Sequence, residues 1–392
     1  MSTVGTSHSL TRTVELGTSL AWTAVAGGTA ASAISLALQP AEAWPGILTA
    51  ALIGTTLALG GALFVAIQAA ASARWWLPFG SVALTLARTL PAPAVALAFC
   101  FLFGLQALYP WARPGAIEAS HLLKEKAAWL NEPLFLARAL VVFVLWFSLI
   151  GALRQRFAAF SREASAANGR RLGRVAVGFL VVYAITNAVA SWDWGMSLEP
   201  EWFSTMYAVY VFAGTFLGGI AAVALLALLL ERAGRLATRL EPSALHDLGK
   251  LLFGFATFWA YIWFCQYMLI WYANLPEETG HYAARLSGGW SMLFYLNPIL
   301  NWVVPFVVLL SAGAKRHAPT LVPAAIVVLL GRWLDCYLLV APAAGPLPGF
   351  PTAAVAATVA VLGGMGLVFR RILARGATDP ASWCCRRWAR HC

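Results

Sequence analysis

The stretch SWDWGMSLEPEWFSTMYAVYVFAG, residues 191–214, joins a Trp-rich acidic connector without Lys or Arg to the start of a long apolar segment. A membrane helix that enters from the non-cytoplasmic face has this pattern, because Trp favours the membrane interface and basic residues stay on the cytoplasmic side. A second stretch, residues 246–278, runs from a basic and polar start through an aromatic-rich span to an acidic exit. The two stretches predict membrane helices of opposite direction.

The composition of the whole chain excludes a soluble globular protein. Of its 392 residues, 60% are hydrophobic and 11% are charged, whereas soluble domains carry about 25% charged residues. A helix needs roughly 20 apolar residues to cross a membrane. We therefore predict an all-α polytopic membrane protein, with a single integral membrane domain over residues 1–390. Ten spans are expected, at Leu16–Leu38, Gly46–Ala73, Pro91–Leu108, Leu134–Leu153, Leu172–Ala190, Met206–Leu230, Leu251–Tyr272, Trp290–Ser311, Pro319–Val340 and Thr352–Phe369.

Two segments need a separate interpretation. The segment from Arg74 to Pro93 is interrupted by Trp, Pro and Arg residues, so we expect it to lie along the membrane interface instead of crossing the membrane. The first span lacks a basic segment before it, and we expect it to remain as an anchor instead of being cleaved.

The distribution of basic residues predicts the orientation. Of the 27 Lys and Arg residues, 21 lie in the N-terminal tail, the even-numbered connectors and the C-terminal tail, and 4 lie in the odd-numbered connectors. The positive-inside rule then places both termini in the cytoplasm. The net charge of +11 is therefore explained by topology, and it requires no nucleic-acid partner.

The cysteine and histidine residues indicate no bound redox centre. The chain has no CxxCH motif and no series of cysteines spaced for an iron–sulfur cluster, and no two of its six histidines lie at ligand spacing inside a span. We expect this chain to hold no haem, no metal and no covalently bound cofactor. A redox cofactor would then be a lipid-soluble carrier or would belong to another subunit.

Four stretches resemble one family of respiratory membrane subunits. They are residues 191–214, residues 246–278, KEKAAWLNEPLFLARALVVF at 124–143 and GRWLDCYLLVAP at 331–342. They are similar to the second NrfD-like membrane subunit of alternative complex III, a quinol:cytochrome c oxidoreductase, and this subunit family is called ActF. The similarity covers most of the chain and is densest from Lys124 to Pro342.

The resemblance implies an NrfD/PsrC-like architecture in the bacterial inner membrane. Two four-helix bundles are expected, at residues 46–190 and 206–340, with the first and last helices peripheral. The implied partners are a sister NrfD-like quinol-binding subunit, an iron–sulfur protein and haem c subunits, and the implied small molecule is menaquinone or its quinol. The chain departs from the family after Pro380, where SWCCRRWARHC ends the basic cytoplasmic tail of residues 376–392, and no function is assigned to this tail.

Three charged residues lie at least one turn inside the expected spans. Such side chains are costly in the membrane, by about 2.5–3.5 kcal/mol at mid-helix, and tend to be functional. Arg332 and Asp335 are three residues apart and share a helix face, so they can pair; this pair is either a structural lock or a proton or quinone relay, with Tyr337 close by. Arg138 lies about one turn inside its helix, and we expect it to reach the interface in a structural role.

Further candidates lie on the seventh helix. His246, Asp247 and Lys250 cluster at its cytoplasmic start, where Asp247 also suits the helix dipole. This cluster is either a capped helix start or a point of proton entry. Gln266, an amide deep in the same span, is interpreted as a contact between helices or as a ligand.

The outer connectors carry the remaining acidic candidates. Quinol oxidation needs a proton acceptor, and a carboxylate or histidine beside the quinol serves this purpose. We favour Asp193, because the Trp residues on both sides restrict its solvation, and we assign Glu199, which precedes Pro200, to a turn. The other members of this group are Glu201, Glu277, Glu278 and His281.

Three classes of function remain open. The first is a non-autonomous subunit of a respiratory quinol:cytochrome c oxidoreductase that supports quinol oxidation and takes part in proton translocation. The second is a secondary transporter, since ten helices with intramembrane charges also fit that class, and Asn297, Pro298, Asn301 and Pro305 interrupt the eighth span. The third is a structural scaffold of the complex.

The charge distribution predicts which connectors an external reagent reaches. In a chain whose own cysteines are replaced by serine, a membrane-impermeant thiol reagent should label Gly280→Cys from outside and should leave Ser165→Cys unlabelled. Labelling of intact cells and of inverted vesicles provides the comparison. The reverse pattern would contradict the proposed orientation.

Overall fold

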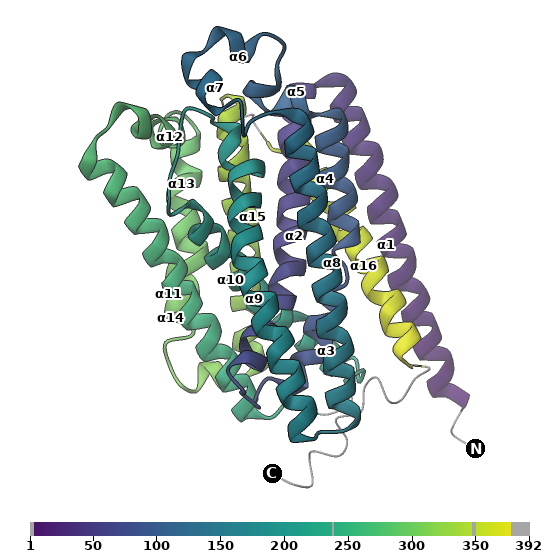
Figure 1. Cartoon of the computed structure of the whole chain (residues 1–392). Helices are drawn as coiled ribbons and strands as arrows, with labels where there is room; N and C mark the ends of the chain where they lie inside the picture. Colours follow the sequence, from purple (N-terminus) through teal and green to yellow (C-terminus); the bar gives the residue numbers. More distant parts are fainter. Residues whose placement is uncertain (1–3, 237–238, 347–349, 378–392) are drawn as a thin grey trace.

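The computed structural model describes residues 4–236, 239–346 and 350–377, and side chains between residues 18 and 375. The described residues are 84% helical and contain no strand. Ten helical segments are long and apolar enough to cross a membrane, and they run side by side through the molecule (Figure 1). The predicted class, an all-α polytopic membrane protein with ten spans, is confirmed. The basic tail, from residue 378 onward, lies outside the described residues.

The ten spans are formed by single helices or by helices in series. Two of them contain more than one α-helix: the third joins two α-helices, and the eighth contains a turn of π-helix between two α-helices. The spans are α1 (Val4–Leu38), α2 (Pro40–Ala70), α3 (Leu77–Ala87) with α4 (Pro91–Phe103), α8 (Glu132–Arg162), α9 (Ala166–Trp194), α10 (Tyr207–Arg232), α11 (Pro242–Ala273), α13 (Trp290–Pro298) with η3 (Ile299–Val303) and α14 (Val304–Val308), α15 (Ala318–Val340), and α16 (Thr352–Ala377).

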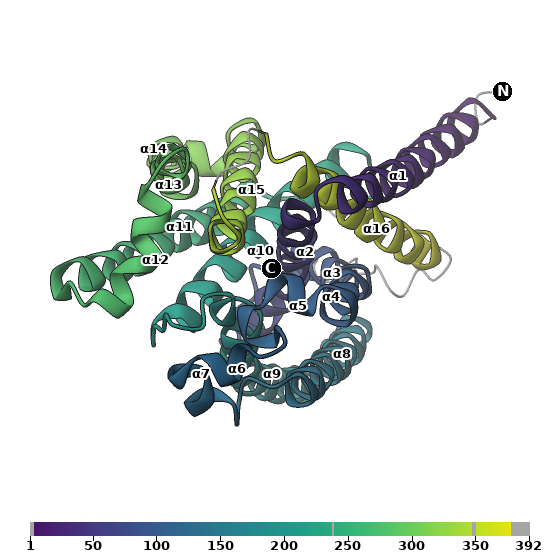
Figure 2. The ribbon, with the colours of Figure 1, turned by 90° about the horizontal axis from the view of Figure 1, so that it is seen from above.

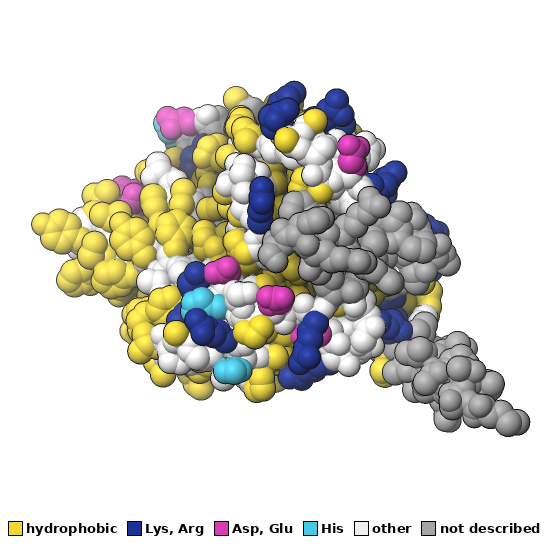
Figure 3. All heavy atoms as spheres, turned by 90° about the horizontal axis from the view of Figure 1, so that it is seen from below, with side chains coloured by type: hydrophobic (Ala, Val, Ile, Leu, Met, Phe, Trp, Pro, Cys, Tyr) yellow, Lys and Arg dark blue, Asp and Glu magenta, His cyan; other side chains and the backbone are white. Residues whose placement is uncertain are grey.

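Short helices form the connectors at the two ends. The end at the top of Figure 1 carries α6 (Ala116–Ala119), α7 (His121–Lys126) and α12 (Pro276–Leu286). We call it the outer end, following the predicted orientation. The opposite end, seen in Figure 3, carries Lys and Arg side chains spread around its surface. The remaining short elements are α5 (Leu105–Leu108), η1 (Pro110–Ala112), η2 (Met196–Leu198), η4 (Ala314–Arg316) and η5 (Ala341–Ala344).

The expectation for the segment from Arg74 to Pro93 is wrong. Most of it forms α3, whose Phe79 and Val82 are fully buried, and α3 packs against α2, α8 and α10. Together with α4 it forms one continuous span from Leu77 to Phe103. The Pro and Arg residues that suggested an interruption stand at helix boundaries: Pro78 in the first turn of α3, Arg88 at its end and Pro91 in the first turn of α4. Proline is tolerated in a first turn because its missing N–H has no helical partner there.

Two helices lie at the centre of the molecule. In both α2 and α10, 83% of the most apolar 18-residue stretch is buried, compared with 6% in α1. A helix that is apolar on all sides lies inside a protein or in lipid. Small residues allow α2 and α10 to pack closely, which places them in the protein interior. Gly60 of α2 and Gly219 of α10 meet so closely that a Cβ on Gly219 would lie 2.4 Å from the Gly60 Cα.

The other spans surround these two helices. α9, α4 and α16 pack on α2, and α11 and α15 pack on α10. α1 lies at the periphery and makes its main contact with α16, as Figure 2 shows from above. The division into two four-helix bundles stays a prediction, since α2 and α10 also pack extensively against each other.

The glycine contact predicts how the central pair responds to one methyl group. Gly219→Ala should lower the stability of the protein by about 1–3 kcal/mol, because the added carbon forces α2 and α10 apart. Gly178→Ala on α9 is the matched control: nothing lies within 4 Å of the added carbon, and alanine is favoured over glycine in a helix by about 0.5–1 kcal/mol. Thermal unfolding in detergent measures both. Equal behaviour of the two variants would contradict this account of the α2–α10 contact.

Candidate functional site

The predicted pairing of Arg332 with Asp335 is confirmed. Their side chains lie on one face of α15, with 2.8 Å between Arg332 Nη2 and Asp335 Oδ2. Asp335 is only 1% exposed and Arg332 only 3%. A charge buried in this way is tolerated only when it is paired and hydrogen-bonded, so the neighbouring helices must supply the remaining partners.

Two other helices supply hydrogen bonds to the Asp335 carboxylate. The Tyr210 hydroxyl of α10 donates to Oδ1, and the Asn297 amide of α13 donates to the same oxygen over 2.7 Å. The Asn301 amide in turn donates to the Asn297 side chain over 2.7 Å. We call Arg332, Asp335, Tyr210, Asn297 and Asn301 the Asp335 cluster.

The local sequence explains the position of the two asparagines. The run from Asn297 to Pro305 contains two prolines, which lack a backbone N–H and interrupt the helical hydrogen bonds. The chain forms the wider π-helical turn η3 there, and the Asn301 amide donates to the Asn297 carbonyl over 3.0 Å. Single π-helical turns inside α-helices are frequent at functional sites.

The guanidinium of Arg332 occupies a space that a glycine leaves open. A Cβ on Gly214 of α10 would lie 2.1 Å from Arg332 Nη2, so a larger residue there would displace the ion pair. The guanidinium also lies over the ring of Trp259 on α11, 5.6 Å from the ring centroid, which favours a cation. Arg332 Nη1 is buried without a hydrogen-bond partner.

The tyrosine that accompanies Asp335 is Tyr210 and not the predicted Tyr337. The Tyr337 ring stacks on Trp333, with 5.4 Å between ring centroids, and packs against Trp290. Two residues along a helix correspond to about 200° of rotation, so Tyr337 points away from the ion pair. Nothing in the sequence around Tyr210 marks it, because the surrounding segment is uniformly apolar.

The cytoplasmic candidates do not reach the Asp335 cluster. Asp247 and Lys250 form an ion pair of 2.6 Å with both side chains partly exposed, and the buried Nδ1 atom of the adjacent His246 has no partner. Thirteen residues separate His246 from Trp259 on the same helix, a distance of about 20 Å. Gln266 is buried on α11, and none of the hydrogen bonds to the Asp335 cluster comes from it.

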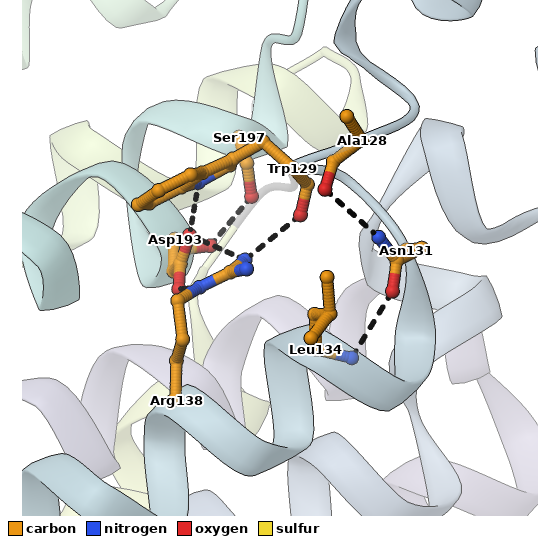
Figure 4. A network of polar contacts seen from close by, with 7 residues as sticks. All are labelled: Ala128, Trp129, Asn131, Leu134, Arg138, Asp193 and Ser197. Atoms are coloured by element: carbon orange, nitrogen blue, oxygen red, sulfur yellow. Dashed lines mark hydrogen bonds and ion pairs between the residues drawn. The ribbon is translucent and has the colours of Figure 1, made fainter.

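Asp193 forms a second buried ion pair, at the outer end (Figure 4). Arg138 of α8 approaches Asp193 within 2.6 Å and 3.0 Å, and the Trp129 indole N–H donates to Asp193 over 2.8 Å. Arg138 also stacks over the Trp129 ring at 4.2 Å. The side chain of Arg138 is 17% exposed and extends to Asp193 at the outer end. Its reach to the membrane interface stays a prediction.

A third cluster at the outer end contains Glu199, His281 and Arg285. Arg285 Nη2 lies 2.7 Å from Glu199, and the nitrogen Nδ1 of His281 lies 2.8 Å from the same carboxylate. Arg285 further donates to the carbonyl oxygens of Leu338 at 2.9 Å and Leu339 at 3.4 Å, in the last turn of α15. Glu199 therefore does more than form a turn: its carboxylate binds His281 and Arg285 of α12, and Arg285 in turn binds the end of α15.

Burial and charge shift the pKa values of this cluster. Burial alone would raise the pKa of Glu199, but Arg285 and His281 outweigh it and hold the pKa at about 2. Burial and the adjacent Arg285 lower the pKa of His281 to about 4, against the opposing effect of Glu199. His281 is therefore neutral at pH 7, and its Nδ1–H donates to the carboxylate. Its ring stacks on Trp202, with centroids 3.8 Å apart.

The other acidic candidates behave as solvated side chains. Glu201 and Glu277 are exposed, and Glu278 is partly exposed. Among the described residues, no group of three or more His, Cys, Asp or Glu side chains is placed to hold a metal ion.

A cavity of about 60 Å³ lies between α2, α8, α9, α10 and α15. Arg332 and Cys336 line it on α15, and Ser191, Trp194 and Tyr207 line it toward the outer end. The Arg332 side of the ion pair thus faces a cavity directed toward the outer end.

The sequence matches no protein-family model, and no curated protein matches it either. The functional interpretation therefore depends on the residues and contacts of this chain. Its chemically distinctive features are the Asp335 cluster inside the membrane and the two ion-pair clusters at the outer end.

The neutral buried state of His281 predicts a loss of stability in acid. Its pKa is about 6.5 when unfolded and about 4 when folded, so folding disfavours its protonation, and stability is lost as the pH falls from 6.5 to 4. The loss corresponds to about 3 kcal/mol. In His281→Gln, which retains an amide donor for Glu199, this part of the pH dependence should disappear. His317→Gln, at an exposed histidine of the opposite end, should behave like the unchanged protein in thermal unfolding across this pH range.

Proposed function

We propose that this chain is an integral membrane subunit of a respiratory quinol:cytochrome c oxidoreductase, in which the Asp335 cluster takes part in proton movement. The four stretches that resemble ActF support the membership in such a complex. The observation that carries the proton role is the Asp335 carboxylate, which is 1% exposed inside a span and bonded to both Arg332 and Tyr210. Ionisable residues at such positions are costly and commonly serve transport of ions or protons.

In the proposed reaction, different subunits carry the electrons and the protons. Quinol oxidation releases electrons and protons together, and the electrons need redox cofactors. In this proposal an iron–sulfur protein and haem c subunits accept the electrons, and a sister NrfD-like subunit holds the quinol. This chain contributes groups that can accept and release a proton, namely the Asp335 carboxylate and the hydroxyl that donates to it.

The size of the cavity beside Arg332 favours this division. The cavity encloses about 60 Å³, whereas a cavity of about 150 Å³ is needed to hold a benzene molecule. The ring of menaquinone is larger than benzene. We therefore assign the quinol ring to the sister subunit or to a surface between subunits, and the proton step to this chain.

A secondary transporter is the second candidate, and one observation favours it. The eighth span is interrupted by η3 beside Asp335, and discontinuous helices at mid-membrane are typical of transporter binding sites. Mild purification from native membranes separates the two candidates. A subunit of the complex should co-purify with partners that show haem and iron–sulfur absorbance, whereas a transporter should purify without them.

The proton role is tested by neutralising both members of the ion pair. Asp335→Asn alone leaves Arg332 buried without its counter-charge, at a cost of about 3–5 kcal/mol, so lost activity of this variant would not be informative. Arg332→Gln combined with Asp335→Asn removes both charges and should allow assembly. In proteoliposomes this double variant should oxidise quinol with a lowered proton-to-electron ratio.

The control for this experiment is Glu163→Gln, which changes an exposed glutamate directly after the end of α8 and should leave the ratio unchanged. If the double variant assembles at normal abundance and keeps the normal ratio, the proton role is excluded. The Arg332–Asp335 pair would then be a structural lock between helices.

A further inference from the structure

Four polar atoms without hydrogen-bond partners lie around one cavity. They are Oγ1 of Thr55 on α2, Oγ of Ser191 on α9, Oγ1 of Thr215 on α10 and Nη1 of Arg332 on α15, and all four residues line the cavity beside the ion pair. The Thr215 hydroxyl lies near that of Tyr183 without hydrogen-bond geometry. Buried polar groups in proteins are nearly always satisfied, so this concentration on four different helices needs a common cause.

The cavity has the volume to hold water. A water molecule needs roughly 15 Å³ of accessible cavity and occupies about 30 Å³ in the liquid. The volume of about 60 Å³ therefore has room for about two to four water molecules. Empty cavities in proteins are lined by apolar groups, whereas four of the residues that line this one carry an unpartnered guanidinium N–H or hydroxyl group.

The chemistry of the four groups suits a connected water cluster. Arg332 Nη1 can only donate hydrogen bonds, so it requires an acceptor, and each hydroxyl can both donate and accept. A water molecule can accept a hydrogen bond from the guanidinium, and it can both donate to and accept from each hydroxyl. No side chain that lines the cavity hydrogen-bonds these atoms directly.

We propose that this cavity holds a cluster of ordered water molecules that hydrogen-bonds Arg332 to Thr55, Thr215 and Ser191. Ser191 lies two residues before Asp193, in the last turns of α9, so the cluster extends from the ion pair in α15 toward the outer end. It provides a polar connection between the two halves of the chain. The proposal does not depend on the redox role, because a transporter with the same cavity would hold the same water.

Two native cysteines provide a test without any substitution. Cys336 lines the cavity, whereas Cys100 lies in the hydrophobic core away from it, and both are free and buried. A short X-ray pulse splits water into hydroxyl radicals where the water lies, and cysteine beside bound water is oxidised. In the full chain in lipid nanodiscs, mass spectrometry should find Cys336 oxidised several-fold faster than Cys100. Equal rates would overturn the proposal.

A matched pair of variants tests which groups hold the water. Thr55→Val removes a hydroxyl from the cavity with little change of shape, and it should lower the oxidation of Cys336 several-fold. Thr49→Val is the control on the same helix, since the Thr49 hydroxyl donates to the Pro45 carbonyl of its own helix, and it should leave the rate unchanged. Equal effects of the two variants, or no effect of Thr55→Val, would contradict the assignment of Thr55 to the water cluster.

Discussion

The ion pair between Arg332 and Asp335 is the constraint on which the second half of this protein depends. Neither charge can be solvated at its position in α15, because both side chains are buried among helices that cross the membrane. Each surrounding helix therefore contributes a group that suits one of the charges: a hydroxyl from α10, an amide from α13 and an aromatic face from α11. A uniformly apolar contact between these helices would be easier to form, but it would leave the pair unsatisfied.

The same constraint explains the irregular backbone near the pair. Gly214 makes room for the guanidinium, and Gly331 makes room for the Asn301 amide, which lies 2.8 Å from the position of an added Cβ. The π-helical turn η3 aligns two asparagines toward α15. Packing and polar satisfaction are therefore coupled here, because small residues stand where polar groups need space.

The outer end is joined to the same helix by a different interaction. Arg285 of α12 binds the carbonyl oxygens of Leu338 and Leu339, about one turn beyond Asp335. These carbonyls lie at the end of α15, where the partial negative charge of the helix favours a cation. Glu199 in turn neutralises Arg285. The connectors between spans are therefore attached to the helix that carries the buried ion pair.

The sequence by itself determined the number of spans, the position of most of them and the pairing of Arg332 with Asp335, because these depend only on local composition and on the helical repeat. Only the tertiary structure decided that Tyr210 and not Tyr337 bonds to Asp335, that Arg138 pairs with Asp193, and that α3 is buried. These contacts join residues 125 or 55 positions apart, or depend on which face of a helix is covered. In a soluble protein, the hydrophobic face of a helix shows which side points to the core, and thus how the helix is rotated about its axis. In a membrane both the lipid-facing and the buried faces are apolar, so the pattern of residues contains little information about the rotation of each helix.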